Sequence, residues 1–67
     1  MDIKKNIENL LASQTITNYQ ISKETGIAQS TLSDYTKGKT KIGNMKLDHA
    51  VLLNEFYLNN MEKLLME

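Results

Sequence analysis

Apolar residues recur at helical spacing along the whole chain. Near the start, Ile3, Ile7 and Leu10 lie three or four residues apart, which predicts one face of an amphipathic helix. Asp2 is placed to cap this helix, and the pattern fades near Ser13. With the later segments, this spacing predicts an all-α fold, a small bundle of four to five short helices.

The clearest helix start lies at Thr17. The Thr17 hydroxyl can accept a free backbone N–H, and Gln20 can reach back to the backbone of Thr17, which is a capping box. Ile16 and Ile21 are spaced as the hydrophobic staple that accompanies such a start. Gly26 suits the left-handed position after a helix, so we expect the second helix to end there.

A third helix is expected over residues 29–37, closed by Gly38. A basic loop over residues 39–43 follows, and Asn44 is the candidate cap of a fourth helix. Asn59 and Asn60 leave two alternatives open: a short fifth helix over residues 61–66, or a fourth helix that continues unbroken. The apolar set of the fourth helix is Leu47, Ala50, Val51 and Leu58, widened by Leu52, Leu53 and Phe56.

Residues 17–37 have the features of a helix-turn-helix, in which two short helices are joined by a tight turn that contains glycine. Ser22 is small enough for a close helix crossing, and Ile27 follows Gly26 as an apolar plug. On the second of the two helices, Leu32 and Tyr35 share one arc. The opposite arc is polar and fits a DNA major groove; it consists of Gln29, Ser30, Ser33, Asp34 and Lys37.

Residues 18–39 resemble the Cro/C1-type, phage-repressor-like family of helix-turn-helix proteins. The resemblance rests on the Gly26-Ile27 turn, on residues 30–33 and on residues 37–39, and it extends over about residues 3–58. It implies a lambda-repressor-like DNA-binding domain whose third helix is the recognition helix. One departure is Ala28, which stands where the family usually has a capping Ser, so the third helix starts less firmly, by about 1 kcal/mol.

Carried over by position, the resemblance implies contacts with double-stranded DNA. The Gln29 amide can bond adenine N6 and N7 together. Asp34 has two interpretations, as an acceptor for cytosine N4 or as a partner of Lys37, and the pairing is favoured. The expected base contacts are Gln29, Ser30, Ser33 and Asp34, and the expected phosphate contacts are Thr17, Asn18, Lys37, Lys39, Lys41 and Asn44.

Charge is distributed unevenly along the 67 residues, which are expected to form one domain. The net charge is zero, but residues 37–46 hold four Lys and no acid, whereas the chain is mildly acidic from Glu55 onward. A basic segment beside a recognition helix suits phosphate contact. The chain has no Cys and one His, and no catalytic constellation, so we expect no metal site, no cofactor, no small-molecule ligand and no enzyme activity.

Residues 56–67 hold more apolar side chains than one small core can use, which favours a dimerisation tail. A heptad-like seam through Leu47, Ala50, Asn54, Tyr57, Met61 and Leu64 is too short to predict a coiled coil, and residues 47–51 are expected to pack within the chain. The expected dimer contacts are Phe56, Tyr57, Met61, Leu64 and Leu65.

These features predict a homodimeric, sequence-specific transcriptional regulator, a repressor of phage, plasmid or mobile-element type, on a partly palindromic operator. The alternative is a helix-turn-helix antitoxin or plasmid-maintenance protein that holds a protein partner through its apolar C-terminal helix. No apolar run approaches the ~20 residues that cross a bilayer, so no membrane contact is expected. The absence of Cys fits a cytoplasmic location.

Overall fold

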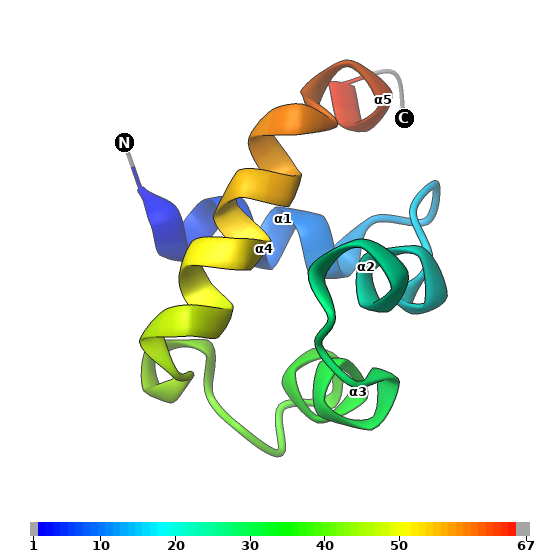
Figure 1. Cartoon of the computed structure of the whole chain (residues 1–67). Coiled ribbons are helices and arrows are strands. Elements are labelled where there is room, and N and C mark those ends of the chain that lie inside the picture. Colours follow the sequence, from blue (N-terminus) through cyan, green and yellow to red (C-terminus); the bar gives the residue numbers. More distant parts are fainter. Residues whose placement is uncertain (1, 66–67) are drawn as a thin grey trace.

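The computed structural model describes residues 2–65, with residue 65 described by its backbone alone. Within that part the chain is all-helical, as the apolar spacing predicted, and it forms a compact bundle of short helices (Figure 1). The elements are α1 (Ile3–Ala12), α2 (Asn18–Thr25), α3 (Gln29–Lys37), the 3-10 turn η1 (Ile42–Asn44), α4 (Leu47–Asn59) and α5 (Met61–Leu65).

The start and the end of α1 are set by local groups. The Asp2 carboxylate accepts a hydrogen bond from the Lys5 backbone N–H at 3.1 Å, which confirms the expected cap. Ser13 adopts an extended conformation after Ala12, so the helix ends where the apolar pattern fades. The inner face of α1 then buries Ile7 and Leu10 in the core.

The capping box at the start of α2 is present in full. The Gln20 backbone N–H donates to Thr17 Oγ1 at 3.2 Å, and the Thr17 backbone N–H donates to Gln20 Oε1 at 3.1 Å. At the other end, Gly26 takes a left-handed conformation with φ of 80°, which confirms it as the end of α2. The position of the turn between α2 and α3 is therefore set by Gly26.

Replacing Thr17 with Ala is expected to lower the free energy of unfolding by about 1 kcal/mol, because a helix N–H loses its acceptor. A urea titration followed by circular dichroism measures the change. Thr40→Ala is the matched control, since the Thr40 hydroxyl has no hydrogen-bond partner in the described part of the chain. Equal effects of the two substitutions would show that the capping box does not stabilise the fold.

The segment after α3 differs in part from its prediction. Gly38 closes α3 with φ of 82°, as expected. Asn44, however, is not the cap of α4: it ends the turn η1, and its backbone N–H donates to the Lys41 carbonyl at 2.9 Å. The N-cap of α4 is Lys46, whose side chain makes no capping bond. The 3-10 turn takes up Asn44, so α4 starts two residues later than expected.

The hydrophobic core lies between α1, α2, α3 and α4. From α4 it takes Leu53 and Phe56, whereas Leu47 and Val51 are exposed, so the expectation that residues 47–51 pack within the chain is wrong for both. The buried residues are Ile7, Leu10, Leu11, Ile16, Ile21, Ile27, Leu32, Tyr35, Leu53 and Phe56.

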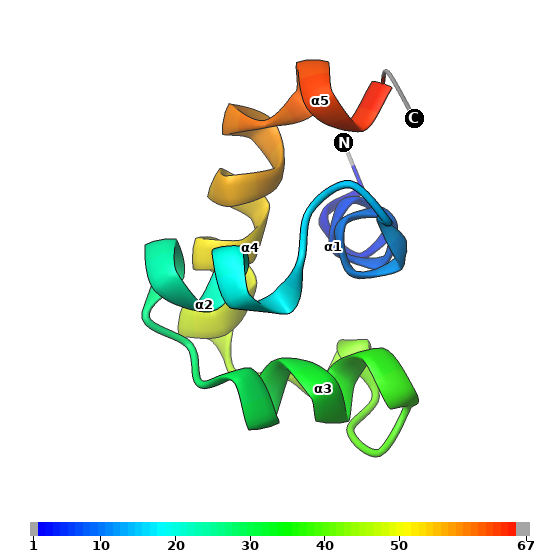
Figure 2. The same cartoon turned by 90° about the vertical axis from the view of Figure 1, so that its right-hand side faces the viewer.

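The fourth helix stops at Asn59, which decides between the two alternatives for its end. The Asn60 side-chain amide donates to the Phe56 carbonyl at 2.8 Å, and its backbone has φ of −120°, outside the helical range. The short α5 then leaves in a new direction (Figure 2). No helix within residues 2–65 combines the length and the apolar character that crossing a bilayer requires.

Candidate nucleic-acid interface

The two arcs of α3 are separated in the structure. Leu32 is fully buried and Tyr35 is buried, so both anchor the helix to the core. On the opposite side, Gln29, Ser30 and Lys37 are exposed, while Ser33 and Asp34 are half-buried at the margin. Helical spacing alone predicted this division, and it leaves one side of α3 open to a ligand.

The inner side of α3 is held by a bond between helices that the sequence did not reveal. Tyr35 Oη lies 2.8 Å from His49 Nδ1 of α4, and the two rings meet edge to face with centroids 6.0 Å apart. His49 is the only His in the chain, and this contact gives it a structural role. The bond fixes the rotation of α3 about its own axis and therefore the direction of its polar arc.

The turn between α2 and α3 is braced by Thr25, whose role the sequence analysis missed. Its hydroxyl donates to the Ile21 carbonyl at 2.6 Å and accepts from the Ile27 backbone N–H at 3.2 Å. Ile27 is buried directly after the turn. This arrangement couples the end of α2 to the core residue that begins the next segment.

The first turn of α2 keeps free hydrogen-bond donors. The capping box uses the backbone N–H groups of Thr17 and Gln20, and those of Asn18 and Tyr19 have no acceptor in the described chain. Such groups at a helix N-terminus attract anions. Tyr19, absent from the predicted contacts, is 60% exposed beside them and carries a phenolic donor.

The basic segment follows directly on α3. Lys37, Lys39 and Lys41 are exposed, as is Asn44. No ion pair joins Asp34 to Lys37 in the described part of the chain, so the favoured pairing of these two residues is wrong. Figures 1 and 2 show α3 and the loop after it at the same end of the molecule. The backbone that carries these cations therefore lies at the α3 end of the molecule.

The predicted dimer contacts do not form one exposed set. Phe56 is buried in the core of its own chain, so its assignment to a dimer interface is wrong. The side chains of Tyr57 and Leu64 are partly buried against the same core. Met61 is exposed, and the side chain of Leu65 lies outside the described residues. The free apolar surface is smaller than expected because Phe56 and Tyr57 face the core from α4 and Leu64 of α5 packs against it.

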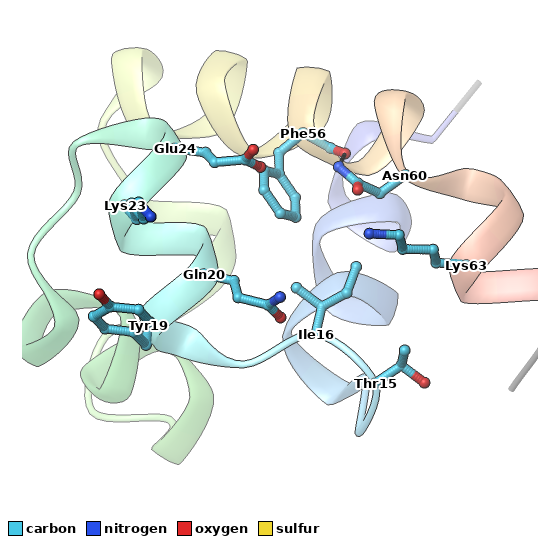
Figure 3. Close-up of a pocket in the computed structure, with 9 residues that line it drawn as sticks. All are labelled: Thr15, Ile16, Tyr19, Gln20, Lys23, Glu24, Phe56, Asn60 and Lys63. Carbon is cyan, nitrogen blue, oxygen red and sulfur yellow. Dashed lines mark hydrogen bonds between the residues drawn. The ribbon is translucent and has the colours of Figure 1, made fainter.

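A hollow of about 660 Å³ opens between α2 and the C-terminal helices (Figure 3). Ile16 and Phe56 form its apolar floor, and its rim carries Lys23 and Lys63. Gln20 also borders it, but its amide oxygen is occupied by the capping box. Among the described residues no polar side chain is buried, and none of them form a cluster that could hold a metal ion.

Comparisons of the chain with protein-family models, with curated proteins and with solved structures find no match.

Proposed function

We propose that the chain is a sequence-specific, double-stranded-DNA-binding transcriptional regulator in which α2 and α3 form a helix-turn-helix. One observation carries the proposal: the polar arc of α3 is open to solvent while its other side is locked to the core through Leu32 and Tyr35. A rigid helix with one accessible polar side is the shape that enters a major groove.

In this proposal α3 reads bases. Gln29 is long enough and exposed to bond one adenine through both amide groups. Ser30 and Ser33 are short, which lets the helix approach the base edges closely. Asp34, which is not paired with Lys37, is available to accept from cytosine N4.

The groups around α3 would fix it on the DNA backbone. The free N–H groups of Asn18 and Tyr19 and the Thr17 hydroxyl would form one phosphate site, and the exposed Lys39 and Lys41, directly after the C-terminal end of α3, would form another. A homodimer would place two such units about 34 Å apart on a partly palindromic operator. The effect on transcription would be occlusion of a promoter.

Selection of bound duplexes from random DNA at a stated salt concentration tests the proposed function. We expect a short enriched motif in two inverted copies, with centres about one helical turn apart. Failure to enrich any motif, with a chain shown to be folded by circular dichroism, would contradict sequence-specific binding.

Replacing Lys39 or Lys41 with Gln is expected to reduce the slope of log K against log salt by about 0.9 per site, because one phosphate contact and its counterion release are lost. Fluorescence anisotropy with the selected site at several salt concentrations measures the slope. Lys63→Gln on α5 is the control with the same change in charge, and its slope should equal that of the parent chain. Equal slopes for all three variants would contradict phosphate contact by this loop.

A further inference from the structure

The outward face of α4 carries an apolar stripe, which we define as Leu47, Val51, Asn54 and Leu58. The three apolar members are 78%, 48% and 40% exposed, respectively. The opposite face of the same helix buries Leu53 and Phe56 in the core. The stripe is therefore left over after the chain has formed its own core.

The stripe has the spacing of a helix that pairs with another helix. Its members follow one another at intervals of four, three and four residues, which is the seam of a left-handed helix pair. Asn54 is its one polar member. Its Oδ1 accepts from Asn6 Nδ2 of α1 at 3.1 Å, and its own Nδ2 has no acceptor in the described chain. A single Asn in such a seam favours one register and two strands.

The direction of α4 selects how two copies can pair. Figures 1 and 2 show that α4 starts near the end of the molecule that holds α3 and runs toward the opposite end. Two copies with parallel α4 helices therefore present both α3 helices at the same end. Antiparallel α4 helices would place them at opposite ends, where one straight duplex cannot meet both.

We propose that the α4 stripe is the contact face for a second copy of this chain, with the two α4 helices parallel around a two-fold axis. Leu47, Val51, Asn54 and Leu58 would each meet the same residue of the partner, and the paired Asn54 amides would bond across the axis. The dimer contact would then lie on α4, rather than on the C-terminal tail. The choice of direction rests on the proposed function, whereas the contact itself does not.

The acidic side chains beside the stripe favour the parallel pair over the antiparallel one. Asp48 and Glu55 are exposed on one side of it, and α1 borders the other side through the bond between Asn6 and Asn54. On α1 and at its N-cap both signs of charge are exposed, through Lys4 and Lys5 and through Asp2 and Glu8, so this side carries no excess of either sign. A two-fold axis parallel to α4 brings the acidic side of one copy against the α1 side of the other. An antiparallel pair would instead bring the two acidic sides together.

The size of the face predicts a weak dimer in solution. Three apolar side chains on one helix bury less than the ~800 Å² per partner of a standard interface. We therefore expect dissociation in the micromolar range, with DNA stabilising the pair because both copies bind one duplex.

Cysteine cross-linking tests the contact and its direction together, since the chain has no native Cys. Under mild oxidation, Val51→Cys is expected to form a disulfide-linked dimer, because the parallel pair brings the two Cα atoms within bonding range. Leu52→Cys is the matched control: it is 37% exposed on the same helix but lies outside the stripe, and it should cross-link at least tenfold more slowly. Equal rates for the two variants would overturn the proposal.

A mixture of Leu47→Cys and Leu58→Cys chains distinguishes the directions. The parallel arrangement predicts disulfides between like chains, and preferential linkage between unlike chains would overturn it. Sedimentation without DNA gives a second readout, in which Val51→Asp should abolish a dimer that Leu52→Asp retains. A wild-type chain that stays monomeric at roughly 100 µM, well above a micromolar dissociation constant, would also overturn the proposal.

These outcomes separate the contact from the proposed function. A monomer that still selects a DNA motif would overturn the α4 contact and support the regulator. A Val51→Cys dimer that selects no motif would support the contact and contradict the regulator.

Discussion

Replacing Leu32 with Ala is expected to lower the free energy of unfolding by about 2–5 kcal/mol, the largest effect of any single change considered for this chain. Leu32 is fully buried, so truncation removes its apolar contacts and leaves a void beside Tyr35 and the core. Small domains are stable by only ~5–15 kcal/mol, and a chain of 67 residues lies near the lower end. Urea titration followed by circular dichroism measures the loss.

Leu47→Ala is the control for this prediction, because it makes the same chemical change at a side chain that is 78% exposed. Its effect should stay within about 0.5 kcal/mol when the protein is studied at low concentration, where a dimer contributes nothing. If Leu47→Ala destabilises the chain as much as Leu32→Ala, then α4 is rotated relative to the structure described above.

Replacing Gln29 with Ala is expected to weaken binding to the selected operator by about 1–3 kcal/mol, which is about 5- to 150-fold in Kd. The Ala side chain cannot bond adenine, whereas the phosphate contacts remain. Binding to unrelated DNA should therefore change little, and the preference for adenine at one position of each half-site should disappear. Competition titrations with operators substituted at each position measure both effects.

Gln14→Ala tests whether loss of any exposed Gln has the same result. Gln14 lies in the loop between α1 and α2 and is exposed, so its removal should leave the base preference intact. If Gln29→Ala binds every substituted operator with the parent chain's ranking, then Gln29 does not read a base.

Local chemistry explains why most helix boundaries could be predicted. Asp2, Thr17 and Gly26 act on backbone groups within four residues of themselves, so the sequence next to each of them contains all that is needed. The same holds for Gly38 after α3. The polar arc of α3 could also be predicted from the sequence, because Leu32 and Tyr35 are three residues apart and the helix has few other apolar residues.

The orientation of α4 could not be predicted in the same way. Apolar residues occupy almost every side of this helix, including Leu47, Val51, Leu52 and Leu58 as well as the buried Leu53 and Phe56. The periodicity of apolar residues then indicates no preferred face, and packing against α1 and α2 determines which face of α4 is buried. Asn44 failed as a cap for a related reason: a 3-10 turn between loop and helix has no clear signal in sequence.

Contacts between distant residues account for the rest of the candidate site. The bond between Tyr35 and His49 joins residues on different helices, and no local sequence pattern near either residue predicts it. Thr25 could have been noticed, because a Thr just before a glycine turn is placed to bond the backbone on both sides. The exposure of Tyr19 could not be predicted, because an aromatic residue near a helix start is found in the core as well as on the surface.

The lack of a side-chain cap on α3 affects how mutants of this protein must be assayed. A nine-residue helix whose N-cap, Ala28, makes no side-chain capping bond would not hold a helix as a free peptide. Apart from the local cap at Gly38, its order depends on packing against the rest of the fold. A screen that measures only DNA binding would therefore not distinguish a variant that has lost a DNA contact from a variant whose fold is destabilised. A thermal melting curve for each variant distinguishes the two cases.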